Sequence, residues 1–128
     1  MTGDAVTSRT GNLWTGEALN AKAMVRPAST AEVSAVLACC NDAKQPVVPA
    51  GGLTGLVEGQ QASAGEILLS LERMNTIEDM NETDRTMTVQ GGAILEIVQQ
   101  KAEAAGLMFP LDLGARASCT IGGNIATN

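Results

Sequence analysis

The 128-residue chain has no histidine and no tyrosine, and its aromatic side chains are Trp14 and Phe109. Without histidine there is no His-ligated zinc or iron, no Ser-His-Asp or Cys-His triad, and no histidine general base. Difficult chemistry would therefore need a bound cofactor or residues outside this chain. The core must be built from Val, Ile, Leu, Met and Ala, and the length is that of one domain or one lobe of a larger protein.

Basic residues are also few, with 8 Lys and Arg against 14 Asp and Glu and a net charge of −6. Nucleic acids and anionic membranes are recognised by clustered Lys and Arg, so we expect neither as a partner. No apolar run approaches the roughly 20 residues of a membrane span. Residues 1–16 lack the basic start and apolar centre of a secretory signal, and we expect a cytoplasmic location.

The cysteines show no C-x-x-C spacing, and Cys39 and Cys40 are adjacent, which rarely permits an unstrained bridge. We expect buried or half-buried reduced thiols at Cys39, Cys40 and Cys119. The acidic residues between 78 and 84 lack the spacing of a calcium loop, which favours a solvated turn. Three isolated arginines are expected to be solvated: Arg26, Arg73 and Arg116.

The first half of the chain predicts an irregular arm, a strand, a helix and two buried strands. Residues 1–23 show no stable periodicity, and residues 24–27 are extended because the residue before a proline favours β geometry. Ser29 and Glu32 form a capping box for an amphipathic helix that ends near Ala43. Its apolar face is Val33, Val36, Leu37 and Cys40, and the two buried strands are 46–49 and 67–71.

The second half predicts a weak strand over 74–80 and a one-sided strand over 85–90 with Met87 and Val89 facing inward. A second amphipathic helix runs from 94 to 105 and is closed by Gly106. Its apolar face is Ile94, Ile97, Val98, Ala102 and Ala105. Residues 109–128 are predicted to be a loop.

The order β-α-β-β-β-β-α contains no repeat and no linker. We therefore predict a single α+β unit, with a small mixed sheet and two amphipathic helices.

Two segments have the composition of ligand-binding loops. Residues 49–56 form a glycine-rich turn directly after a strand, where glycine amides can approach an anion and Thr54 adds a hydroxyl donor. Residues 118–128 alternate small hydroxyl residues with glycines and end in amides. Neither segment has G-x-G-x-x-G or G-K-[ST] spacing, which excludes the Rossmann and Walker loops. A tight connection without a ligand is the alternative for each.

Together, the motifs over 25–33, 47–56 and 110–128 resemble a known flavoprotein family. They are similar, in order and spacing, to the FAD-binding domain of the vanillyl-alcohol oxidase and p-cresol methylhydroxylase (PCMH) family. The resemblance covers residues 24–128, and the wording of 110–119 is that of the branch containing D-2-hydroxyglutarate and D-lactate dehydrogenases. It implies the N-terminal lobe of a PCMH-type FAD-binding domain over 24–128, which follows the irregular arm over 1–23.

The resemblance also implies residues for a non-covalent FAD site. The first segment would surround the diphosphate and comprises Pro49, Gly51, Gly52, Leu53, Thr54, Gly55 and Leu56. The second would line the ribityl chain and flavin edge and comprises Pro110, Gly114, Ser118, Thr120, Gly122, Gly123, Asn124, Ala126 and Thr127.

The chain departs from this family in three ways. Leu53 stands where the branch usually has Asn, and Glu58 stands where a second glycine pair is usual. The family's domain also continues beyond residue 128 to a further lobe and a substrate domain, which carry the catalytic histidines and substrate-binding arginines. No catalytic residue is therefore assigned in this chain.

Three functions remain open from the sequence. The first is the FAD-binding lobe of a flavin-dependent 2-hydroxy-acid dehydrogenase, incomplete and not catalytic alone, with the remainder of that enzyme as partner. The second is a non-enzymatic remnant that forms a homodimer and no longer binds FAD, and that possibility follows from apolar surface left uncovered. The third is a module that binds another nucleotide or anion in the same loops.

Overall fold

The computed structural model describes residues 1–11 and 16–127, so Trp14 and Asn128 lie outside the described residues. The elements follow one another as α1 (Asp4–Thr7), β1 (Ala23–Val25), α2 (Thr30–Asp42), β2 (Val47–Ala50), β3 (Ile67–Ser70), β4 (Ile77–Asn81), β5 (Thr86–Val89), α3 (Leu95–Ala104) and α4 (Ile121–Thr127). The predicted α+β class, with a small sheet and helices, is confirmed.

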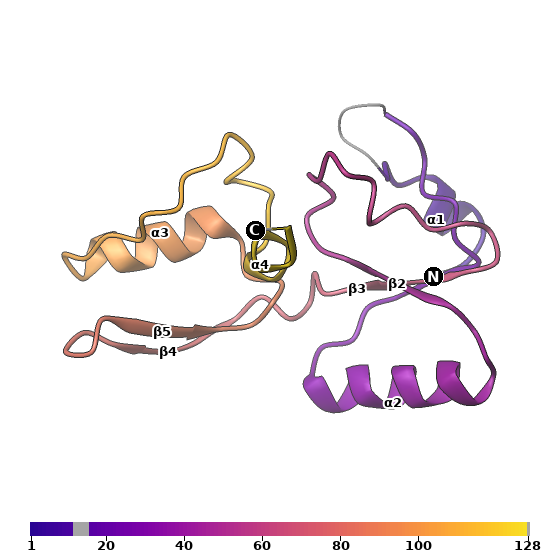
Figure 1. Ribbon diagram of the computed structural model, residues 1–128, viewed down its shortest axis with the longest axis horizontal. Helices are drawn as coiled ribbons and strands as arrows, with labels where there is room; N and C mark the ends of the chain where they lie inside the picture. Colours follow the sequence, from indigo (N-terminus) through magenta and orange to yellow (C-terminus); the bar gives the residue numbers. More distant parts are fainter. Residues whose placement is uncertain (12–15, 128) are drawn as a thin grey trace.

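The first sheet is parallel, with the order β1-β3-β2. Met24, Leu68 and Leu69 are buried in it, and Pro49 lies opposite Leu69 on the edge strand β2. An edge position suits proline because no ladder partner is needed on its outer side. In Figure 1, α2 runs along one side of this sheet and α1 lies on the other.

The second sheet is the antiparallel hairpin β4-β5, which lies beside α3 in the other half of Figure 1. Met87 and Val89 are half-buried between exposed neighbours, as the alternation predicted. The single mixed sheet that the sequence predicted is therefore two separate sheets, one parallel and one antiparallel.

The N-terminal arm is less irregular than expected. It contains the short helix α1 and a bridge between Thr10 and Ala18. Val6 is fully buried and Leu19 is 3% exposed, and both belong to the core cluster completed by Met24, Ala50, Ala62 and Leu68. The sequence pattern missed this because the two apolar residues are too far apart to form a local period.

Helix α2 is confirmed with its cap. The Ser29 hydroxyl accepts a hydrogen bond from the Glu32 amide at 3.2 Å, but the Glu32 carboxylate accepts from the Ala28 amide at 2.7 Å, one residue earlier than a standard capping box. None of residues 30–42, all described, is fully buried, so the predicted apolar face remains partly open to solvent. Cys39 is exposed, contrary to prediction, whereas Cys119 is buried.

Helix α3 is confirmed, and Gly106 ends it with φ +70°, but its buried face differs from the prediction. The buried residues are Leu95, Val98 and Ala102, while Ile97 is 48% exposed. The reason is tertiary, because the start of α3 lies against a distant segment: the Leu95 amide donates to the carbonyl of buried Cys119 at 3.1 Å, and Leu95 is buried at this contact.

The prediction of a loop throughout 109–128 is wrong, because Ile121–Thr127 forms the helix α4. Two glycines make this helix unfavourable in isolation. Here the amides of Ile121 and Gly122 donate to the carbonyls of Ala93 and Gly91 at 2.9 and 2.8 Å. Packing against a distant segment thus outweighs the low local propensity.

Within residues 1–11 and 16–127, no helix is both long and apolar enough to cross a membrane.

Candidate functional site

The glycine-rich turn begins where β2 ends at the carboxyl edge of the parallel sheet. Ala50 is buried, and its carbonyl accepts a hydrogen bond from the Leu71 amide at 3.1 Å. Gly51 and Gly52 follow, and the chain then adopts a left-handed conformation at Leu53, with φ +57°. In parallel sheets, ligands bind beyond the carboxyl ends of the strands, which is where this turn lies.

The structure places this turn directly against residues 118–120. A methyl group on Gly51 would overlap the Thr120 hydroxyl oxygen. A methyl group on Gly52 would overlap the Ser118 carbonyl oxygen and lie 3.0 Å from the Cys119 Cα. Both positions therefore require glycine for steric reasons, and the two segments singled out from the sequence form one surface.

Two buried polar atoms beside this contact lack a partner among the described residues. They are the Thr120 Oγ1 and the Asn124 Nδ2, and Thr120 is 6% exposed. A buried polar group without a hydrogen bond costs about 1–3 kcal/mol, so such groups call for an explanation. A polar ligand bound along the edge where the two segments meet would partner them.

Helix α4 continues this surface. Gly122 is packed against Gly91, and a methyl group on Gly123 would lie 3.3 Å from the Thr120 hydroxyl oxygen. The backbone amide of Asn124 donates to the Thr120 carbonyl at 2.9 Å. Ala126 and Thr127 are exposed on the last turn of α4.

Other predicted site residues lie at the margins or elsewhere. Pro49 is exposed on β2, Leu56 is 74% exposed, and Thr54 and Gly55 are half-buried in the turn. The Gly55 carbonyl accepts from the Gln60 side-chain amide at 3.2 Å, which closes the turn. Gly114 is exposed, and Pro110 lines a different surface feature.

That feature is a groove of about 670 Å³ between α3 and residues 107–116. Carboxylates of Glu96, Glu103 and Asp112 line it together with Pro110. Acidic side chains make this groove a poor site for a diphosphate. A second hollow of about 480 Å³, next to it, is lined by Met80, Met87, Met108 and Phe109 among others.

The departures noted in the sequence have different local consequences. Leu53 adopts a left-handed backbone and its side chain packs against the core cluster. Glu58 also has a positive φ, +59°, but it is exposed, and its carbonyl accepts from the Gln61 amide at 2.9 Å.

Two features near the carboxyl edge of the parallel sheet were not predicted from the sequence. The first is Gly91-Gly92, interpreted only as a strand terminator. The Gly91 carbonyl accepts a hydrogen bond from the Gly122 amide of α4, and a methyl group on Gly92 would overlap the Leu71 carbonyl oxygen. A glycine pair directly after a strand was the available signal.

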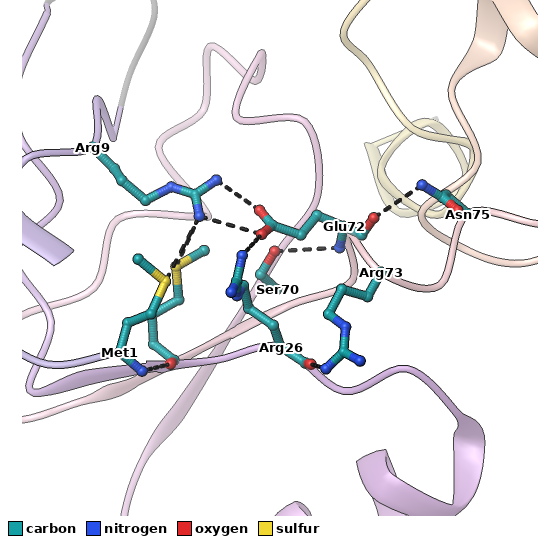
Figure 2. A network of polar contacts seen from close by, with 8 residues as sticks. Met1, Arg9, Arg26, Ser70, Glu72, Arg73 and Asn75 are labelled. Atoms are coloured by element: carbon teal, nitrogen blue, oxygen red, sulfur yellow. Dashed lines mark hydrogen bonds and ion pairs between the residues drawn. The ribbon is translucent and has the colours of Figure 1, made fainter. Parts of the chain in front are cut away.

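The second is an ion-pair network beyond the ends of β1 and β3 (Figure 2). Arg9 donates to both carboxylate oxygens of Glu72, at 2.7 and 3.3 Å, and Arg26 donates to one of them at 2.7 Å. Burial alone would raise the pKa of Glu72, but the hydrogen bonds and positive charges of Arg9 and Arg26 outweigh burial and lower that pKa.

The three arginines expected to be solvated are all partnered, although each is partly exposed. Arg26 binds Glu72, Arg73 donates to the Arg26 carbonyl at 3.0 Å, and Arg116 pairs with Asp112 at 3.0 Å. In the described part of the chain, no group of three or more Cys, Asp or Glu residues could hold a metal ion.

The chain matches a known protein family and is similar to several curated proteins. A family model described as "FAD binding domain" matches residues 21–128. A D-2-hydroxyglutarate dehydrogenase of Xanthomonas citri pv. viticola is 51% identical over 109 residues, which are 85% of this chain and 23% of that protein. A D-lactate dehydrogenase of Anaerostipes hadrus is 41% identical over 105 residues, 82% of this chain and 22% of that protein.

The same pattern extends to a mitochondrial D-2-hydroxyglutarate dehydrogenase of Bos taurus, 40% identical over 85% of this chain and 20% of that protein. Among solved structures, an alkyldihydroxyacetonephosphate synthase superposes with a TM-score of 0.74 at 21% identity, over 81% of this chain and 21% of that one, which shows a shared fold. The chain thus spans about a fifth of the length of the curated relatives it matches.

Proposed function

Because this chain belongs to the FAD-binding domain family, we propose that its glycine-rich turn and the facing residues 118–124 hold FAD in a flavin-dependent 2-hydroxy-acid dehydrogenase. FAD is the cofactor of this family. The assignment of individual residues to FAD rests on the geometry of the two segments. The single observation that carries it is the Thr120 hydroxyl, buried against Gly51 and without a partner among the described residues.

The residues present fit FAD. Backbone amides of the turn suit the diphosphate, because successive amides form a concave nest for an anion. Gly51 and Gly52 leave no side chain in the way, and Thr120 and Asn124 add buried polar atoms that a cofactor oxygen could partner. None of these 128 residues is a histidine, so the proposed site itself offers no histidyl attachment point for flavin, which supports non-covalent binding by this segment.

The activity of the whole enzyme is proposed from its relatives. When bound, FAD supplies the acceptor for the hydride of a 2-hydroxy acid. Within this arrangement the present residues bind and orient the cofactor, and none of them is assigned a catalytic role. The substrate class follows from the relatives named D-2-hydroxyglutarate and D-lactate dehydrogenases, of which this chain spans about a fifth.

Titration of the purified chain with FAD, followed by flavin fluorescence, tests the site. We expect saturable binding, weakened at least about tenfold by Gly52→Ala, which corresponds to about 1.4 kcal/mol. The added methyl group forces the turn away from the Ser118 carbonyl. Gly65→Ala is the matched control, since nothing described lies within 4 Å of its added methyl group. Absence of binding by the unaltered chain would contradict the proposal.

A second copy of the chain is the partner that we propose when no larger partner is present. Among the described residues, four large apolar side chains are more than 70% exposed: Leu56, Val57, Met108 and Ile125. Exposed apolar groups of this kind favour self-association, most often as a symmetric dimer.

We also propose a cytoplasmic location. Some relatives are named as mitochondrial, so imaging of the tagged protein in its source cells is the test.

A further inference from the structure

Leu53 has an unusual backbone conformation for its side chain. Its φ of +57° lies in the left-handed region, where glycine and asparagine are common and branched apolar residues are rare. It sits in the middle of the turn, with Gly51 and Gly52 before it and Thr54 and Gly55 after it. Such a conformation persists only where the surroundings hold it, and it is typical of functional loops.

The surroundings here are apolar. The Leu53 side chain packs against the core cluster, which includes Ala50 at the end of β2 and Ala62 within the connection from β2 to β3. Leu53 is therefore fixed to the same cluster as the residues that bracket it. This anchor offsets the unfavourable backbone and restricts the glycines on both sides.

Part of the cluster comes from the N-terminal arm. Val6 is fully buried and Leu19 is 3% exposed, and both precede residue 21, where the family match begins. In Figure 1 the arm and α1 lie on the same side of the sheet as the connection that follows β2.

The arm is itself tied to the sheet by polar contacts. The terminal amine of Met1 donates to the Met24 carbonyl at 2.8 Å, and Arg9 forms an ion pair with Glu72, as Figure 2 shows. The Leu19 amide donates to the Arg9 carbonyl at 2.8 Å, which links the buried leucine to the ion-paired arginine. These bonds set the position of the apolar surface on which Leu53 rests.

We propose that Leu53 is a positioning residue, and that the N-terminal arm supports the glycine-rich turn through it. The arm supplies Val6 and Leu19 to the cluster, the cluster holds the Leu53 side chain, and Leu53 holds the amides of the turn in the conformation that receives the diphosphate. The last step rests on the proposed function. The ordering of the turn does not, because it is a property of the chain without cofactor.

The test compares Leu53→Ala with Leu53→Met in two measurements. NMR relaxation of the backbone amides of Gly51, Gly52 and Gly55 reports order in the chain without FAD, and FAD titration reports affinity. We expect Leu53→Ala to increase the motion of these glycines and to weaken FAD binding about tenfold. Leu53→Met, which retains an apolar anchor, should remain within about twofold of the unaltered chain. Leu37→Ala, at a leucine 46% exposed on α2, is the matched control.

A second comparison needs no substitution, so it decides the matter even if Leu53→Ala does not fold. In the unaltered chain, the amides of Gly52 and Gly55 should be as ordered as those of β2, unlike those of Gly59 and Gly65, whose surroundings are open. Equal mobility at all four glycines would overturn the proposal, as would a Leu53→Ala chain with an unchanged turn and unchanged FAD affinity. An ordered turn that binds no FAD would instead overturn the proposed function and leave the anchoring intact.

Discussion

The Thr120 side chain is buried, with Thr120 only 6% exposed, yet its hydroxyl has no hydrogen-bond partner among the described residues, a combination that is unfavourable in a chain without ligand. Burying such a group lowers the free energy of unfolding, and a ligand that accepts its hydrogen bond would restore that stability. Gly51 lets the hydroxyl approach the turn, because any side chain there would occupy the same space. The Thr120 hydroxyl oxygen would therefore favour cofactor binding while it lowers the stability of the chain without cofactor.

Replacement of Thr120 by valine should separate these demands. Valine keeps the β-branched shape and removes the hydroxyl, so we expect the free energy of unfolding to stay equal or to rise by about 1 kcal/mol. FAD affinity should fall about tenfold, because the ligand loses a buried hydrogen bond. Urea unfolding and FAD titration measure the two effects.

Thr88→Val on β5 provides the matched control, since Thr88 is exposed and distant in sequence from both loops. We expect neither quantity to change by more than the experimental error in this variant. A Thr120→Val chain that binds FAD as tightly as the unaltered chain would remove the hydroxyl from the cofactor site.

Among the elements, those with local signals were predictable and those without were not. Ser29 and the apolar spacing after it marked α2, and Gly106 marked the end of α3, because caps and periods act over a single helical turn. Helix α4 was missed because its stability comes from hydrogen bonds to Gly91 and Ala93, about thirty residues earlier. The buried face of α3 was misjudged for the same reason.

Glu72 ties the arm to the ends of β1 and β3, and this tie should depend on pH. The pKa of Glu72 is lowered in the folded chain, so folding favours the carboxylate. Its contribution is complete above the unfolded glutamate pKa of about 4.3 and is lost as pH falls through the lower folded pKa. We expect Glu72→Gln to lower the free energy of unfolding by about 1 kcal/mol near neutral pH, a modest value because the ion pairs are partly exposed.

The difference between Glu72→Gln and the unaltered chain should shrink as pH decreases from about 5 to about 3, because both then lack the carboxylate. Urea unfolding at several pH values measures it. Glu103→Gln removes the same charge from an exposed position on α3 and should show no such convergence. A constant difference across this range would mean that the ion pairs do not act through the charge of Glu72.

The whole molecule consists of two halves that meet at glycines. The parallel sheet with α1, α2 and the arm forms one half, and the hairpin with α3 and α4 forms the other, as Figure 1 shows. Gly52 packs against the Ser118 carbonyl, and Gly92 against the Leu71 carbonyl. The proposed FAD site lies at the first of these contacts, so bound cofactor would join residues of both halves.

Self-association is the prediction that belongs to this scale. We expect light scattering to show a dimer of the isolated chain, because the exposed apolar side chains have no cover within the described residues. Met108→Ser, which changes a side chain that is 82% exposed, should weaken the dimer without lowering FAD affinity. A monomer at all concentrations, with or without FAD, would contradict this prediction.

The sequence by itself determined the local elements and, through three motifs in order, the family and its cofactor. Strand runs, helix periods, caps and glycine turns are short-range properties, and the motifs preserve the residue types that FAD requires. Only the tertiary structure decided that Gly51 meets Thr120, that α4 forms, and that Val6 and Leu19 lie in the core with Leu53 packed against them. These contacts join residues far apart in the chain, where no local pattern carries the information and burial and backbone approach determine the outcome.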